Sequence, residues 1–156
     1  MCQDPVLWLE ELLKLMGYPP ATVKLIATPD PANFWLEIVP QGWRSREIQS
    51  LIGEQGEVLD AIQHLINATL NLPKTQQPVF YTIEINGYRA QRLNELEQIA
   101  ERAAETVRST GKDYKIEHLS AAERRHIHLI LEKSPDLKTE SVGKEPHRHL
   151  LVKLVT

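Results

Sequence analysis

The sequence lacks several features that mark large classes of protein. Its 156 residues include a single cysteine, Cys2, so no disulfide can form within the chain, and we expect a reducing, cytoplasmic environment. No apolar run approaches the ~18 residues that a membrane-spanning helix needs. The longest such stretch, residues 6–16, is interrupted by three charged side chains and has no basic segment before it. We therefore expect neither a signal peptide nor a membrane anchor.

Neither sign of charge is in large excess over the whole chain, but the charge is unevenly distributed. The chain has 18 Lys and Arg against 21 Asp and Glu, and its 42% hydrophobic content is typical of a folded protein rather than a disordered one. Residues 1–88 hold 5 basic and 10 acidic side chains, whereas residues 89–156 hold 13 and 11, with five of the six histidines. This asymmetry predicts two functional domains, residues 1–88 and residues 89–156, with any basic site local to the second.

Hydrophobic periodicity and turn residues predict an α+β chain without internal repeats. In the first part we expect a helix, two strands, a short helix, a Gly-x-x-Gly turn, a longer helix and a strand, at residues 5–16, 22–28, 33–39, 45–51, 53–56, 57–72 and 78–85. In the second part we expect a long helix, a short strand, a helix opened by a Ser-x-x-Glu capping box and two closing strands, at residues 88–109, 114–118, 120–133, 136–141 and 150–155.

The Gly-x-x-Gly turn carries a suggestion about function. Gly53 and Gly56 let the backbone bend sharply and approach a ligand closely. The helix after the turn presents its free N–H groups and positive dipole end to a phosphate. A Gly-x-x-Gly loop that clamps a nucleotide backbone is typical of KH domains. Alone the tetrapeptide is a weak signal, because any tight turn between helices can use two glycines.

The residues around this turn extend the signal. Residues 51–65 read Leu-Ile-Gly-Glu-Gln-Gly-Glu-Val-Leu-Asp-Ala-Ile-Gln-His-Leu, and residues 85–92 read Ile-Asn-Gly-Tyr-Arg-Ala-Gln-Arg. Both stretches resemble the KH domain of the bacterial Jag family, including its Tyr-Arg-x-x-Arg helix start. The resemblance implies a type II KH domain joined by the long helix to a second domain. It also implies that the nucleic-acid loop consists of Gly53, Glu54, Gln55 and Gly56.

The charge of this loop departs from the family pattern. Family members often carry Lys or Arg between or beside the glycines, whereas this chain has Glu54 and Gln55 between them and Glu57 just after. Carboxylates repel a phosphate where binding would come from charge neutralisation, although Glu57 also suits a helix N-terminus. The loop is therefore compatible with a nucleic-acid clamp or with a retained fold used for packing or for binding a partner.

The second half contains a pair of residues suited to binding a phosphate. Arg124 and His128 are four residues apart in a predicted helix, so they project from one face. Ile127 marks the buried side, which places the pair along its border and Arg125 further into solvent. Arg offers a planar fork of donors, and His offers a donor that can gain charge. The simpler alternative is an ordinary surface helix with scattered charge.

Residues 123–128 and 139–148 resemble the domain named for its Arg-x-x-x-His signature, the R-three-H domain, which binds single-stranded nucleic acid and follows the KH domain in Jag proteins. The resemblance covers about residues 33–156. The separate N-terminal domain of many Jag proteins is expected to be absent, because few residues precede the KH segment. The resemblance implies a nucleic-acid site made of Arg124, Arg125, His128, Lys144, His147 and Arg148.

Metal binding and catalysis have little support in the sequence. His126 and His128 point far apart on a helix, and His147 and His149 lack a third ligand at a suitable spacing, so we expect no metal and no cofactor. The chain has no nucleophile motif, phosphate-binding Lys loop or paired-carboxylate signature, so we expect it not to be an enzyme. Among the tryptophans, Trp43 is the best candidate for stacking on a base.

Two functions are consistent with these observations. The first is a cytoplasmic regulator that binds single-stranded RNA, with single-stranded DNA as an alternative ligand, mainly through residues 89–156. The second is a protein-interaction module in which residues 1–88 dock a partner, and the family resemblance implies a second KH-domain protein as that partner. The acidic loop favours partner docking by residues 1–88. The cationic residues favour nucleic-acid binding by residues 89–156.

Overall fold

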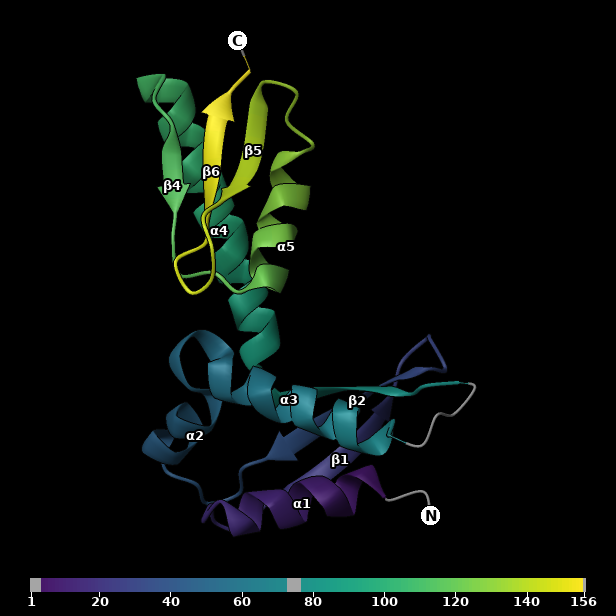
Figure 1. Cartoon of the computed structure of the whole chain (residues 1–156). Helices are drawn as coiled ribbons and strands as arrows, with labels where there is room; N and C mark the ends of the chain where they lie inside the picture. The colour runs from purple at the N-terminus through teal and green to yellow at the C-terminus, as the bar shows by residue number, and fades with distance from the viewer. Residues whose placement is uncertain (1–3, 73–76, 156) are drawn as a thin grey trace. The chain divides into compact units, whose positions relative to one another are not determined.

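The computed structural model describes residues 4–72 and 77–155, and the chain divides into two compact units, Met1–Arg89 and Ala90–Thr156 (Figure 1). Helix α4 (Tyr88–Thr110) begins in the first unit and continues into the second. Helices and strands occur in both units, which confirms the α+β class expected from the sequence. Within the described ranges, no helix is both long and apolar enough to cross a membrane.

The first unit combines a three-stranded sheet with three helices. The strands lie in the order β1-β2-β3, with β1 antiparallel and β3 parallel to β2. This is the order of elements predicted from the sequence and implied by a type II KH fold. In chain order the elements are α1 (Pro5–Leu15), β1 (Thr22–Ala27), β2 (Asn33–Val39), α2 (Ser45–Ile52), the 3-10 turn η1 (Glu54–Gly56), α3 (Glu57–Leu70) and β3 (Phe80–Ile85).

Trp43 belongs to the core of this unit. Its side chain is 8% exposed and stacks on the ring of Tyr18, with 5.2 Å between the ring centroids. Its indole N–H donates to the carbonyl of Pro20 across 3.1 Å, so the polar atom of the buried ring is also satisfied. The expectation that Trp43 stacks on a nucleic-acid base is therefore wrong, because both its face and its donor are used within the protein.

Side-chain amides of α3 cover the outer edge of β3. Asn67 accepts from the N–H of Tyr81 and donates to its carbonyl, both at 2.8 Å. Asn71 makes the same pair of bonds to Val79, at 3.1 and 2.8 Å, and Gln63 accepts from the N–H two residues beyond Tyr81. Here, residues four apart on the helix lie opposite every second residue of the strand beside it. The three amides thus take the place of a neighbouring strand and close an edge that could otherwise pair with another chain.

The second unit packs two helices against a small antiparallel sheet. Its strands lie in the order β4-β6-β5, and Figure 1 shows α5 beside β5. Buried alanines of α4 and apolar residues of α5 and the strands form its core. After α4, the elements are β4 (Tyr114–Ile116), α5 (Ala121–Leu131), β5 (Leu137–Val142) and β6 (His149–Leu154).

The start of α5 is fixed by the capping box that the sequence predicts. Ser120 accepts from the N–H of Glu123 at 3.2 Å, and the Glu123 carboxylate accepts from the N–H of Ser120 at 2.8 Å. The other oxygen of Glu123 accepts from Nε of Arg92 on α4 at 2.7 Å. This contact ties the first turn of α5 to the long helix, so side chains from the first turns of α5 project from a well-held position.

Candidate nucleic-acid interface

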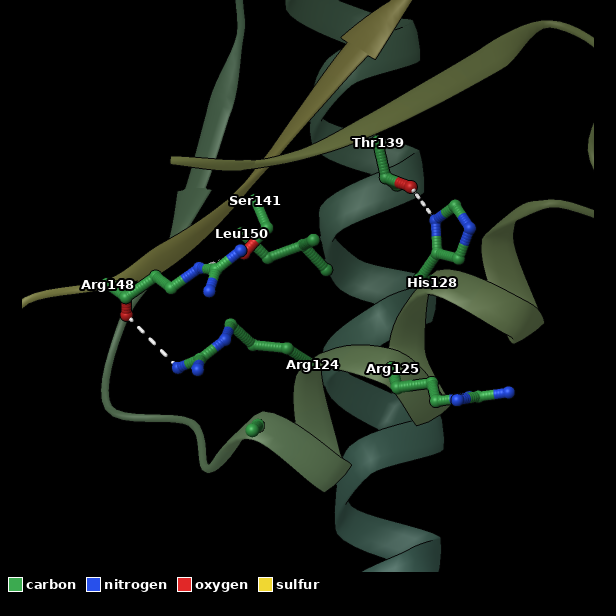
Figure 2. A pocket seen from close by; sticks show the side chains of 8 residues that line it. Arg124, Arg125, His128, Thr139, Ser141, Arg148 and Leu150 are labelled. Carbon is green, nitrogen blue, oxygen red and sulfur yellow. Dashed lines mark hydrogen bonds between the residues drawn. The ribbon is translucent and has the colours of Figure 1, made fainter. Parts of the chain in front are cut away.

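A hollow of about 310 Å³ lies in the second unit between α5 and strands β5 and β6 (Figure 2). The side chain of Leu150, which is buried, gives it an apolar floor. Basic and hydroxyl side chains surround this floor, a combination that suits a ligand with anionic and apolar parts. The lining residues are Ala121, Arg124, Arg125, His128, Thr139, Ser141, Arg148 and Leu150.

Two arginines bring unneutralised positive charge to the hollow. Arg125 on α5 and Arg148, just before β6, are both exposed, and neither pairs with a carboxylate in the part of the chain that the structure describes. Nε of Arg148 donates to the hydroxyl of Ser141 on β5 at 2.9 Å, which orients its guanidinium beside the hollow. Unpaired guanidinium groups held in this way can bind a phosphate with two parallel hydrogen bonds.

His128 adds a third polar group on the same side. Its ring is exposed on α5, and Nδ1 is hydrogen-bonded to the hydroxyl of Thr139 on β5 (Figure 2). The bond joins the helix and the strand that form two walls of the hollow. It also fixes the plane of the imidazole, so the ring can offer a donor to a ligand in a defined direction.

Arg124 lies deeper than the sequence predicts. It is 5% exposed rather than at the border of the buried face, and its guanidinium bonds within the protein. Nη1 donates to the carbonyls of Leu119, at 2.6 Å, and of Arg148, at 3.3 Å, while Nη2 pairs with the carboxylate of Glu145. A buried guanidinium is tolerated because these acceptors take hydrogen bonds from both Nη atoms and one of them carries the opposite charge. Helical periodicity could not reveal this, since two of the acceptors are more than 20 residues away.

The remaining basic residues of the predicted site lie in the loop between β5 and β6. Lys144 and His147 are exposed, and the N–H of His147 donates to the carbonyl of Lys144 at 2.8 Å in a tight turn. Neither side chain lines the hollow. The structure therefore gathers four of the six predicted residues of this half around one hollow and places the other two in the adjoining loop.

The Gly-x-x-Gly loop of the first unit is built around its two glycines. A Cβ on Gly53 would lie 2.5 Å from a methyl group of Val58, and one on Gly56 would lie 2.5 Å from the hydroxyl of Tyr88. Both glycines also have positive φ, so packing and backbone conformation each require glycine. Glu54 and Gln55 are exposed between them. The loop thus presents negative charge, without a Lys or Arg from residue 51 to residue 60.

Three polar residues in or beside the hollow were missed by the sequence-based site prediction. Thr139 and Ser141 alternate on a predicted strand, so their shared face is a signal that could have identified them. Glu145 lies within the stretch 139–148 that resembles the R-three-H domain, but it was not assigned to the site, because an acidic residue is not expected beside a phosphate. Among the described residues, no group of three or more His, Cys, Asp or Glu side chains could hold a metal ion.

Ion pairs that shift pKa values lie away from the hollow. The guanidinium of Arg108 donates two hydrogen bonds to Asp136, at 2.6 and 2.9 Å, and holds the pKa of that carboxyl below its ordinary value. A hydrogen bond from Lys115 likewise lowers the pKa of Glu117. Both pairs are on the surface and include no residue that lines the hollow, so they act on the stability of the second unit rather than on its site.

Comparison with known proteins shows which domain family the second unit resembles. Residues 94–154 match the family model of the R-three-H domain. The RNA-binding protein KhpB of Clostridium symbiosum is 32% identical over 104 residues, which cover 67% of this chain and 46% of that protein. KhpB of Bacillus subtilis (strain 168) is 28% identical over 165 residues, covering 90% of this chain and 78% of that protein.

A third relative, KhpB of Lactiplantibacillus plantarum, is 31% identical over 102 residues, covering 65% of this chain and 31% of that protein. The chain thus spans less than half the length of two of these three relatives. The match to the R-three-H domain and the similarity to these proteins confirm the resemblance to the Jag type that the two sequence motifs indicate.

Proposed function

We propose that this chain binds single-stranded nucleic acid, primarily RNA, through the hollow of its second unit. In this proposal it does not catalyse a reaction. The observation that carries the proposal is the pair of exposed, unneutralised arginines, Arg125 and Arg148, beside His128 around one hollow. The match to the R-three-H domain and the similarity to proteins named RNA-binding protein KhpB support the same conclusion. Single-stranded DNA is the alternative ligand.

In this proposal a phosphate of the strand lies between α5 and the start of β6. Arg125 approaches it from the helix and Arg148 from the end of the loop before β6, and together they replace the counterion that this phosphate holds in the free nucleic acid. His128 donates a further hydrogen bond, and the apolar floor provided by Leu150 contacts a sugar or a base. Phosphate contacts position a strand without reading its sequence. We therefore expect binding with little dependence on sequence.

The loop between β5 and β6 extends the same basic surface. Lys144 and His147 are exposed beside Arg148, so a strand that leaves the hollow along this loop meets further positive charge. We propose that these two residues contact neighbouring phosphates. Their contribution is expected to be smaller than that of Arg125, because neither side chain lines the hollow.

We place this activity in the cytoplasm, where the single cysteine of the chain would stay reduced. We propose that the chain acts there as a regulator, which makes segments of the bound RNA inaccessible or brings bound partners to them. Crosslinking in cells, followed by sequencing of the bound RNA, identifies these segments.

The direct test uses the full chain and a labelled single-stranded RNA, with affinity measured by fluorescence anisotropy. Arg125→Ala is expected to weaken binding by ~1.5–3 kcal/mol, the range for hydrogen bonds to charged groups. Arg102→Ala is the matched control, because Arg102 is exposed on α4 in the same unit and does not line the hollow. Equal affinities of the two variants would contradict the proposed site.

A second function is favoured for the first unit by its acidic loop. Exposed Glu54 and Glu57 repel phosphates, which favours docking of a partner, such as a second KH-domain protein, over RNA binding at this loop. If the loop does lie near the RNA, replacing both residues with Lys strengthens binding at low salt. If affinity stays unchanged, the loop is distant from the nucleic acid, and the docking function is the better account of this unit.

A further inference from the structure

We propose that Arg124 and Glu145 act as a positioning pair, which holds the loop between β5 and β6 in the conformation that binds nucleic acid. Neither residue touches the ligand in this proposal. The acidic Glu145 then strengthens the binding of an anion, although its charge alone would weaken it. The inference rests on the proposed function of the hollow.

Arg124 is held by hydrogen bonds within the protein. With 5% of the side chain exposed, its guanidinium offers little surface to a ligand. Its three acceptors belong to three parts of the unit: the carbonyl of Leu119 precedes α5, Glu145 lies within the loop, and the carbonyl of Arg148 ends the loop. Arg124 thus fastens the loop at two points to the helix that carries Arg125 and His128.

The loop between β5 and β6 is packed closely against itself. Its turn is closed by the hydrogen bond from His147 to Lys144, and a Cβ on Gly143 would lie 3.1 Å from the carbonyl oxygen of His147. Because the loop is packed this closely, holding Glu145 in place also holds the loop residues next to it. Lys144, His147 and Arg148 all lie on this loop, so their positions depend on the two anchors.

The charge of Glu145 distinguishes a positioning role from a passive one. The side chain of Glu145 is 61% exposed, in a loop that otherwise carries two basic residues and a histidine. If it were a bystander, its carboxylate would repel an approaching phosphate, and its removal would strengthen binding. As the partner of Arg124 it neutralises a buried charge and holds the loop. The two roles predict opposite signs for the same substitution.

The test compares Glu145→Ala with Glu145→Gln in the full chain, using anisotropy titrations of a labelled single-stranded RNA. Alanine removes the acceptor, whereas glutamine keeps a carbonyl oxygen that can accept from Arg124. We expect the alanine variant to bind about threefold to tenfold more weakly, a typical loss for one hydrogen bond. The glutamine variant should bind within about twofold of the unchanged protein.

Glu140→Ala supplies the matched control for charge. Glu140 is an exposed carboxylate on β5 that pairs with Lys153 and does not line the hollow. Removing the carboxylate of Glu140 changes the net charge of the unit by the same amount as Glu145→Ala. We expect this variant to bind as well as the unchanged protein or slightly better, which measures the general effect of removing one negative charge.

A double-mutant cycle with Arg124→Gln tests the coupling of the pair. If the two residues act together, Glu145→Ala costs little more once Arg124 has been replaced. Melting temperatures and the hydrogen exchange of amides 143–148 are recorded for each variant, and we expect faster exchange in this loop for Glu145→Ala. If Arg124→Gln does not fold, the comparison of the two Glu145 variants still decides the question.

Affinity of Glu145→Ala equal to or above that of the unchanged protein would overturn the positioning role. The positioning role would also be overturned if the Arg124 substitution weakened RNA binding, the Glu145 substitution strengthened it, and the two effects were additive in the double variant. That result would mean that Arg124 contacts the phosphate and that Glu145 only repels it. A lack of RNA binding by the unchanged protein is a separate result, which would overturn the proposed function of the hollow and the role of the pair with it.

Discussion

His128 and Thr139 connect two walls of the hollow through a single hydrogen bond between Nδ1 of the imidazole and the threonine hydroxyl. The two residues come from different elements, α5 and β5, and both line the hollow. A ring held in this way is oriented before a ligand arrives, so less side-chain freedom is lost when the ligand binds. We therefore expect the affinity of the proposed site to depend on Thr139, a residue that carries no charge.

Replacing Thr139 with Val tests this dependence. Valine keeps the branched shape and removes the hydroxyl, so the imidazole loses its fixed orientation. We expect RNA binding to weaken by ~0.5–1.5 kcal/mol, the net contribution of one hydrogen bond. The comparison is Thr106→Val on α4, which removes a hydroxyl bonded to the helix backbone. Unchanged affinity in Thr139→Val would show that the orientation of His128 does not matter.

Loss of the Asn67 amide is expected to destabilise the first unit. Asn67→Ala removes both hydrogen bonds to Tyr81 and leaves backbone groups of β3 without partners, which should lower the free energy of unfolding by ~1–3 kcal/mol. All three tryptophans lie within residues 1–88, so tryptophan fluorescence in a urea titration follows this unit. Gln49→Ala, at an exposed position of α2 in the same unit, is the control. A loss in the control as large as that in Asn67→Ala would argue against the edge contacts.

The pair of Arg108 and Asp136 predicts a dependence of stability on pH. The arginine lowers the pKa of Asp136 in the folded state, so the pair stabilises the fold above the ordinary pKa of an aspartate. That contribution is lost as the pH falls through the lowered value. Asp136→Asn should therefore melt at a lower temperature than the unchanged protein near pH 7, and the difference should shrink as the pH falls below the ordinary range of an aspartate. A difference that stays constant with pH would contradict this assignment.

Local signals in the sequence were sufficient to predict the elements that carry the site. Ser120 and Glu123 are three residues apart, and their spacing alone predicts the cap that starts α5. The glycine pair likewise predicts the sharp turn between α2 and α3, because positive φ strongly favours glycine. These features depend on residues close together in the chain, so they could be recognised before the fold was known.

Features that depend on distant residues were not predicted. Arg124 was expected at the border of its helix, but an acceptor 21 positions later and a carbonyl 24 positions later allow it to be buried. The sequence makes Trp43 a candidate for base stacking, but in the structure its ring stacks on Tyr18, which lies 25 positions earlier in the chain. Which polar or aromatic side chain is buried depends on partners brought close by the fold, and periodicity along one element cannot reveal them.

The salt dependence of RNA binding tests the central claim most directly. For single strands the slope of log affinity against log salt is about −0.7 for each phosphate neutralised. The double variant Arg125→Ala/Arg148→Ala removes the two unpaired arginines proposed to hold one phosphate in the hollow, so its slope should be shallower than that of the unchanged protein by ~0.7, whereas Arg102→Ala should leave the slope as it is. Equal slopes for the double variant and the unchanged protein, with both folded, would mean that the hollow does not neutralise phosphates.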